Sequence, residues 1–445
     1  MQVLRLGCGL LVAYGCGRTA ASDLDDASGA SGGSNESGGA QAHAGSKPSG
    51  GASSTGGSSS SGNGGAMPAS GGSLASGGSL ASGGAFSATG GVDGVDGGAG
   101  DAGSAGVGGD SGECGVNVPA TNATGGLQAA IDAAPVPSTV CLGPGGFRGD
   151  LRLRAGVSLR GLGVGSVICG TVNGDAATSR RTTLSDLQIE GAFEATGNVQ
   201  LSFRDLEINT YHTAICLPGS SAGVRIAQTG GGALDLAIDG VTLGSPGFEI
   251  ALTPGGERID DSIAIRNSRC DSTSQCYDFL RFTFDTQPAA QAGIGSRLML
   301  DIFNNVIRNV VLEGVVFDVK GGLSAEDAAQ SRLWFRHNTL ASAGDSNSAI
   351  AFYTPPSLPV VLANNAIAYI ATPVLHGDAP AVTQIGNLVS ADEGSTSWFA
   401  DFANGDFSLS VNSPLIGHGS SVYGVPTDID GTTRVGGFDS GAYQH

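Results

Sequence analysis

The sequence predicts an all-β solenoid in which short strands stack as parallel coils. Seven times an apolar residue is followed two places on by Asp, Asn, Gly or His, and three places later by another apolar residue. The central positions lie 19, 35, 27, 37, 33 and 27 residues apart, which fits coils joined by loops of variable length. Short apolar alternations separated by Gly-rich turns continue to about residue 390. The central residues are Asp186, Asp205, Gly240, Asn267, Asn304, His337 and Asn364.

Each central residue is predicted to stand at a corner of its coil. Asp, Asn and Gly tolerate the left-handed backbone of a sharp bend. Strand side chains alternate between two faces, so the flanking apolar residues both point inward only if the chain turns between them. Directly after three corners stand Asn305, Asn338 and Asn365. This predicts a buried ladder of amides that bond from coil to coil.

The N-terminal part is predicted to serve export and attachment. Residues 1–15 read as a signal peptide, because Arg5 precedes a short apolar stretch and small residues. The residues before Cys16 resemble a bacterial lipobox, so Cys16 is the expected lipidation site; simple secretion is the alternative. Residues 16–113 are mostly Gly, Ser and Ala and bury too little apolar area to fold. We expect a lipidated N-terminus followed by a disordered tether.

A short helix is predicted at the start of the folded part. Leu127, Ala130, Ile131 and Ala134 have helical spacing, and Pro135 ends the run. One short amphipathic helix cannot form a core by itself. We expect it to cover the first coil, whose apolar interior and unpaired backbone would otherwise meet water.

The charge balance limits the class of partner. From Cys114 onward the chain holds 31 Asp and Glu against 18 Lys and Arg, within a net charge of -19. An acidic surface argues against nucleic acid, whose binding requires neutralised phosphates. It also denies long-range attraction to anionic polysaccharides, unless an Arg cluster or bound Ca²⁺ reverses the charge of one groove.

Cysteine usage indicates an oxidising compartment. If Cys8 leaves with the signal and Cys16 takes lipid, six cysteines remain, and their pairing is open. Six cysteines permit about 15 pairings, and two closures suggest themselves: Cys114 with Cys141, which would fasten the start of the domain, and Cys270 with Cys276, which would close a short loop. Zinc is the competing interpretation, yet no Cys-x-x-Cys or His-Cys cluster occurs. The six disulfide candidates are Cys114, Cys141, Cys169, Cys216, Cys270 and Cys276.

Two stretches carry a family resemblance. Residues 127–134, a Gly-Pro-Gly turn and residues 157–161 resemble the start of the right-handed parallel β-helix of the pectate-lyase-like superfamily. Residues 406–416, 427–431 and 439–443 resemble the choice-of-anchor Q ending, with Ser440 and Gln444 as small departures. The resemblance implies a β-helix over 114–404, a C-terminal cap over 405–445, a surface location and frequent glycan contact. It does not fix an activity.

The candidate binding residues fall into two groups. Arg204, Asp239 and Arg266 each precede a corner and are expected to point outward, either lining a saccharide groove or forming an alternating-charge ladder, which we favour. Tyr277 and Arg281 lie in one of the two longest intervals, and long loops are where a β-helix builds a groove.

Lys320, Arg336 and His337 are the candidate catalytic residues. Lyases that abstract a proton beside a uronate carboxylate need a Lys, Arg or Tyr base and a cation that stabilises the enolate. Lys320 is the one lysine after residue 114. The alternative is a solvated lysine beside Asp318.

Three further motifs have structural interpretations. Adjacent Asp260 and Asp261 would point to opposite faces of a strand, so a hydrolase or Ca²⁺ pair is not favoured. The Gly-His-Gly run at 417–419 is assigned to a turn. The acidic run at 428–431 has metal-like spacing, but nearby Arg434 favours an ion-paired cap.

Together these observations predict a surface-tethered lipoprotein. It is expected at the outer membrane or cell surface, monomeric, and bound to the membrane through its lipid alone. The leading hypothesis is binding of polysaccharide or another surface partner without catalysis, with no cofactor and no metal. The alternative is a polysaccharide lyase or related glycan-active enzyme, for which Ca²⁺ would be the expected ion.

Overall fold

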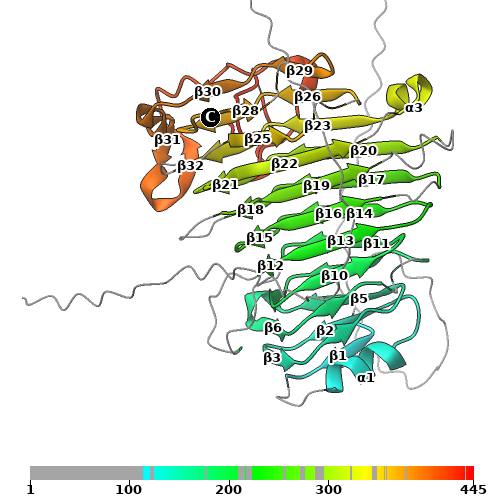
Figure 1. Ribbon diagram of the computed structural model, residues 1–445. Coiled ribbons are helices and arrows are strands. Elements are labelled where there is room, and N and C mark those ends of the chain that lie inside the picture. The colour runs from blue at the N-terminus through cyan, green and yellow to red at the C-terminus, as the bar shows by residue number, and fades with distance from the viewer. Residues whose placement is uncertain are drawn as a thin grey trace, which may run out of the picture. The chain divides into compact units, whose positions relative to one another are not determined.

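Each turn of the chain visits three parallel sheets in the same order, which builds a parallel β-helix (Figure 1). The computed structural model describes residues 114–120, 125–175, 177, 179–208, 216, 223–253, 257–270, 276–285, 295–320, 323–342, 348–354, 356, 358–375, 377, 379–435 and 437–445. The predicted signal, Cys16 and the tether lie outside these residues. The predicted fold class is confirmed.

We name the sheets A, B and C in the order in which a turn visits them. Sheet A contains β1 (Val116–Val118), β2 (Ser138–Leu142), β5 (Val157–Gly161), β8 (Thr182–Ser185), β11 (Gln200–Arg204), β14 (Asp235–Asp239), β17 (Asp260–Arg266), β20 (Arg297–Phe303), β23 (Arg332–Arg336), β26 (Val360–Ala363) and β29 (Val382–Ile385). Sheet B contains β3 (Gly145–Arg148), β6 (Ser166–Cys169), β9 (Gln188–Glu190), β12 (Glu207–Ile208), β15 (Thr242–Leu243), β18 (Arg269–Cys270), β21 (Val306–Arg308), β24 (Thr339–Ala341), β27 (Ala366–Ala368) and β30 (Leu388–Ser390). Sheet C contains β4 (Leu151–Arg152), β7 (Val172–Asn173), β10 (Phe193–Thr196), β13 (Val224–Gln228), β16 (Phe248–Leu252), β19 (Leu280–Asp285), β22 (Glu313–Lys320), β25 (Ser348–Phe352) and β28 (Val374–Leu375).

The seven predicted corners all lie between a strand of sheet A and a strand of sheet B. Each central residue has a positive φ, from 49° at Asp205 to 68° at Gly240. Gly386, with φ 63°, makes a further corner of the same kind. The sequence pattern missed it because Gln384 stands where the pattern requires an apolar residue.

The predicted amide ladder is present and is one rung longer than expected. The Asn338 Oδ1 accepts from the Asn305 amide N at 3.0 Å and from its Nδ2 at 2.9 Å. The same pattern repeats from Asn338 to Asn365 and from Asn365 to Asn387. Each side-chain amide also donates to a backbone carbonyl, such as that of Ile302. Buried amides are therefore satisfied at every rung.

The interior is apolar because alternate strand residues point into the coil. Phe282, Phe317 and Phe352 are in register on three successive strands of sheet C and are all buried. Their ring centroids lie 6.3 and 5.3 Å apart. Such columns of like residues hold the strand register, since a one-residue slip would turn each column to solvent.

The first coil is covered by a helix, as predicted. Helix α1 (Gly126–Ala133) buries Leu127 and Ile131 in the core and contacts β1 and β4. A second helix, α3 (Ala325–Gln330), begins after Ser324, whose hydroxyl accepts from the Asp327 amide. Short 3-10 helices occur at Gly163–Gly165, Glu393–Trp398, Phe402–Asn404 and Ser421–Tyr423. No helix of the described residues is long and apolar enough to cross a membrane.

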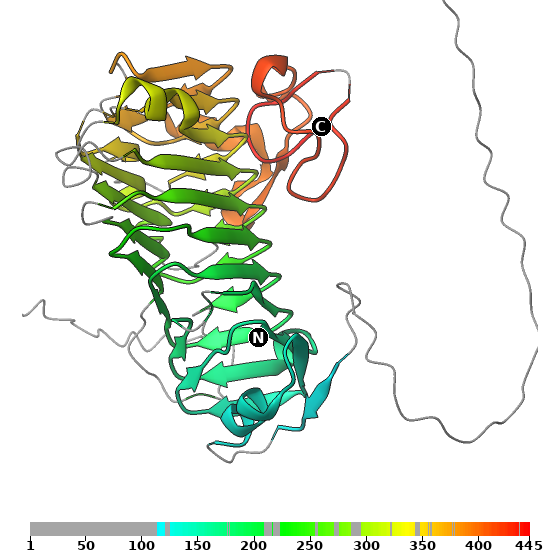
Figure 2. The same ribbon diagram turned by 90° about the vertical axis from the view of Figure 1, so that its right-hand side faces the viewer.

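The stacked strands end at Ser390, and the following chain returns along the side of the stack (Figure 2). Strands β31 (Phe399–Asp401) and β32 (Asp406–Leu409) pair antiparallel, so the predicted boundary after residue 404 falls inside one small unit. Phe407, Leu415 and Tyr443 of this segment pack with Ala341 and Ala366 of sheet B. The segment therefore covers the outer face of sheet B over its last coils.

Arg434 and Asp428 hold this segment in a way that differs from the predicted ion-paired cap. The buried Arg434 guanidinium donates to the carbonyls of Gly441 and Ala442 and to the Asn304 side chain. The Asp428 carboxylate accepts from backbone amides, including that of Thr432 at 2.7 Å. Both charges are therefore satisfied mainly by main-chain groups.

The six disulfide candidates form three bonds. Cys114–Cys141 and Cys270–Cys276 pair as the spacing suggested, and the remaining two form Cys169–Cys216. The first bond ties the start of the described chain to β2, next to α1.

Candidate functional site

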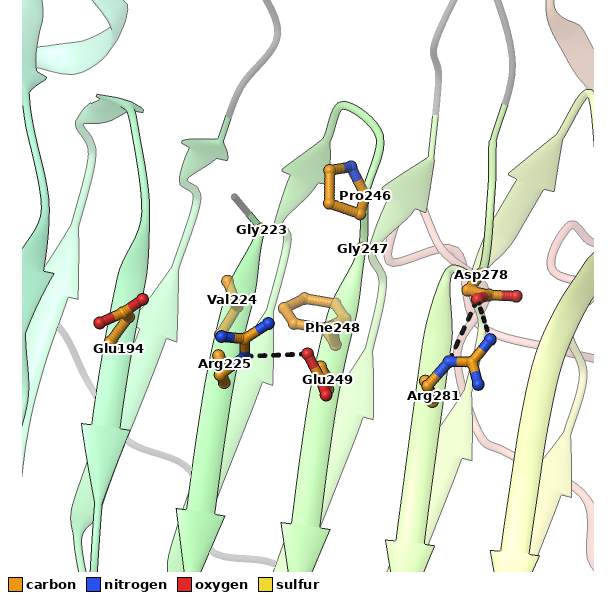
Figure 3. Close-up of a pocket in the computed structure, with 10 residues that line it drawn as sticks. All are labelled: Glu194, Gly223, Val224, Arg225, Pro246, Gly247, Phe248, Glu249, Asp278 and Arg281. Atoms are coloured by element: carbon orange, nitrogen blue, oxygen red, sulfur yellow. Dashed lines mark hydrogen bonds and ion pairs between the residues drawn. The ribbon is translucent and has the colours of Figure 1, made fainter. Parts of the chain in front are cut away.

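The outer face of sheet C carries a groove of about 460 Å³ (Figure 3). Strands β10, β13, β16 and β19 form its floor, and the turns that enter these strands form its upper rim. The lining residues are Glu194, Gly223, Val224, Arg225, Pro246, Gly247, Phe248, Glu249, Asp278 and Arg281.

Four charged side chains cross the groove floor in one row. Glu194, Arg225, Glu249 and Arg281 are in register on successive strands, and each stands between two inward-facing residues of its strand. Neighbouring strands are about 4.8 Å apart, so the groove presents an ionic group of alternating sign at that interval.

Exposed ion pairs hold this row together. The Arg225 Nε donates to the Glu249 Oε2 at 2.9 Å, and both side chains are largely exposed. Such a pair contributes little to stability, which leaves both groups able to bond a ligand instead. The pair thus offers donors and acceptors side by side.

The far end of the groove is more tightly organised. The Arg281 Nη2 donates to the Asp278 Oδ2 at 2.6 Å, and Asp278 has a φ of 48°. The hydrogen bond that Arg281 donates to Asp278 raises the pKa of Arg281, so the guanidinium stays charged. The Asp278 amide donates to the Glu313 carbonyl, and burial, followed by the Asp278 charge, raises the pKa of the Glu313 carboxyl.

Two tyrosines neighbour Arg281 and Asp278 at this end of the groove, one in space and one in the chain. Tyr353 interacts with Arg281 and contributes to its raised pKa. Tyr277 directly precedes Asp278 in the chain, and both tyrosine side chains are exposed. An exposed aromatic ring beside bidentate polar groups is suited to an apolar sugar face with hydroxyls at its edge.

The five predicted binding residues do not form one site. Arg281 lines the sheet C groove and Tyr277 directly precedes the lining residue Asp278, but Arg204, Asp239 and Arg266 are in register on sheet A. Arg266 pairs with Asp239 at 2.8 Å, the geometry of the charge ladder that we favoured. They lie apart because each precedes a corner, and all these corners follow sheet A.

The predicted catalytic residue His337 is a corner residue inside the protein. It has a φ of 52°, is fully buried, and its Nε2 lies 2.9 Å from the Asn364 Nδ2. Burial, and then the charges of Arg434 and Arg336, lower the pKa of the imidazole to about 3. Its ring packs beside that of Phe438, 5.8 Å between centroids. The imidazole is neutral and out of reach of a polymer.

Lys320 and Arg336 also lie apart from each other. The Lys320 Nζ is 2.6 Å from Asp318 at the end of β22 in sheet C. The Arg336 Nη2 is 2.6 Å from Asp301 at the corner end of β23 in sheet A, and its guanidinium lies over Trp334. The connection carrying α3 and the length of β23 separate them. The three residues therefore do not form the single centre that the lyase hypothesis placed there.

The remaining motifs follow their structural interpretations. Asp260 pairs with Arg297 on the outer face of sheet A, while the next residue, Asp261, is fully buried. Gly417 and His418 lie in a turn, and Gly419 pairs with Phe438 just after it. Within the part of the chain that the structure describes, no group of three or more His, Cys, Asp or Glu side chains is placed to hold a metal ion.

Comparisons with known proteins are sparse. No protein-family model matches the chain, and no curated protein matches it. A solved structure described as pectate lyase Pel9A is similar with a TM-score of 0.36 and 14% identity, over 71% of this chain and 90% of that one. The fold assignment above depends on the strand register and not on this likeness.

The sequence reasoning missed Glu194, Arg225 and Glu249. Each is a charged residue between two apolar residues, once per coil, as in Phe193-Glu194-Ala195. That pattern was available. The row does not follow from the corner pattern, because it lies on sheet C and every corner lies between sheets A and B.

Proposed function

We propose that this chain is an exported surface protein that binds a polysaccharide along the sheet C groove without catalysis. The row of Glu194, Arg225, Glu249 and Arg281 is the observation that supports this proposal most strongly. An extended polymer of hydroxyl groups can satisfy donors and acceptors repeated along a straight floor. No reaction is assigned, because Lys320, Arg336 and His337 do not line the groove.

Binding is expected to depend on Arg281 and not on Arg266. The full chain would be tested against neutral and uronate-containing polysaccharides by affinity electrophoresis and calorimetry. Arg281→Ala should weaken binding about tenfold, the effect of losing one charge-assisted hydrogen bond. Arg266→Ala is a matched control, since the two side chains are 42% and 49% exposed and each pairs with one aspartate.

The outcomes of this experiment test the location of the site and the binding function separately. Binding that responds equally to Arg281→Ala and Arg266→Ala would reject the groove as the site. A chain that binds no polysaccharide would reject the function. New ultraviolet absorbance from unsaturated ends, or release of reducing sugar, would replace binding with the enzyme hypothesis.

The attachment at the N-terminus is part of the same proposal. The lipobox-like run before Cys16 and the tether composition support a lipid anchor, and the choice-of-anchor Q resemblance of the C-terminus supports a surface location. The long Gly/Ser-rich tether would let the β-helix reach away from the membrane.

Cys16→Ser is expected to move the protein from the membrane fraction to the soluble fraction. The reason is that a thioether-linked lipid requires the cysteine sulfur. Fractionation followed by immunoblotting measures the change. Cys8→Ser is the control and should leave the membrane fraction unchanged; equal fractionation of the two variants would reject lipidation at Cys16.

A further inference from the structure

The two ends of the strand stack are covered differently. The N-terminal end carries α1, which buries Leu127 and Ile131 against the first coil. The other end consists of β28, β29 and β30, each the last strand of its sheet. These three strands therefore present one unpaired edge each among the described residues (Figure 1).

The apolar interior reaches solvent at this end. Val389 of β30 stands in register with Ile367 of the coil before it. Ile367 is 1% exposed, whereas Val389 is 44% exposed. In sheet A, Gln384 is exposed above the fully buried Leu362. The loss of burial in the same columns shows that no described segment covers the last coil as α1 covers the first.

This end also lacks the usual protection against pairing. Natural edge strands are blunted by charged side chains, proline or bulges, but β28, β29 and β30 contain no charged residue and no proline. The rest of the chain from residue 114 has a marked excess of acids. Like charge therefore opposes self-association over most of the surface, whereas these three strands carry no charge of their own.

We propose that a second copy of this chain docks on this end through a two-fold axis perpendicular to the stack. Such an axis places the last coil of one copy on the last coil of the other with the chain direction reversed. One of the three sheets then meets the same sheet of the partner, and each of the other two meets the partner's other sheet. β29 then pairs antiparallel with the partner's β29, and β30 with the partner's β28. The contact is isologous, and α1 blocks the opposite ends, so assembly stops at a dimer. This replaces the monomer expected from the sequence.

The oligomeric state of the full chain tests the proposal. Sedimentation velocity should give a dimer that dissociates on dilution. Val389→Lys, which places two charges at the contact, should give a monomer with an unchanged circular dichroism spectrum. Val411→Lys is the control, because Val411 is 76% exposed and lies in the C-terminal segment; this variant should stay dimeric. A wild-type chain that is monomeric throughout overturns the proposal.

A cross-link tests the symmetry. Because β29 faces its own copy, Thr383→Cys should form a disulfide-linked dimer under mild oxidation, whereas Val411→Cys should not. A dimer that survives Val389→Lys and fails to cross-link would place the contact on another face, and would also overturn the proposal. The monomeric Val389→Lys variant should still bind polysaccharide, so a failure of the dimer proposal can be told apart from a failure of the groove proposal.

Discussion

Replacing Asn338 with alanine is expected to lower the free energy of unfolding by about 4 kcal/mol, because it removes a buried rung of the amide ladder. Its Oδ1 accepts two hydrogen bonds from Asn305, and its Nδ2 donates to Ile302 and Asn365. Asn338 is fully buried, so no water replaces these bonds. The partners left without bonds account for most of the loss.

Urea unfolding followed by tryptophan fluorescence would measure this change. Asn404→Ala is the control: Asn404 is exposed and its side chain bonds only to nearby Asp401 among the contacts described. Its substitution should change the free energy of unfolding by less than about 0.5 kcal/mol. Equal midpoints for the two variants would contradict a structural role for the ladder.

Asp261 is expected to make the protein less stable as the pH rises from about 4 to about 6. Burial raises the pKa of this carboxyl to about 6. In that interval the folded state binds a proton that the unfolded state has released, so raising the pH favours unfolding. The loss is complete above the folded-state pKa and amounts to about 3 kcal/mol at 1.36 kcal/mol for each pKa unit.

Asp261→Asn isolates this effect from other titrations. The Asp261 Oδ1 accepts from the Leu234 amide and from the Gln228 Nε2, while its Oδ2 and the Gln228 Oε1 are buried without a described partner. The introduced amide keeps the acceptor and adds a donor. The variant should match the wild type near pH 4 and be more stable above pH 6. Asp260→Asn, on the exposed face, is the control; parallel pH profiles for wild type and Asp261→Asn would contradict the prediction.

The corners were predictable because their chemistry is local. Asp186, Asn267 and Asn304 favour a left-handed backbone whatever surrounds them. Asn305 and Asn338 recur at the position directly after a corner. The length of the intervals does not disturb this signal. The fold class therefore follows from residues whose backbone preference needs no tertiary context.

The site was harder to predict because its contacts are distant in the chain. The burial of His337 depends on Phe438, and the pairing of Arg336 depends on Asp301 in the preceding coil. Both residues looked available in the sequence. Arg281 was found because it lies in a long interval, but its neighbours across the groove become a row only when three coils are in register.

The amide ladder has a consequence for how this protein can change in size. Each link of the ladder is made by the same pair of side-chain and main-chain bonds, so the bonding of a rung does not depend on its position in the chain. A duplication or loss of one whole turn within the ladder would leave the remaining rungs joined and would change the length of the stack by one strand spacing. Gain or loss of complete turns is thus a simple route by which related β-helices of different length could arise.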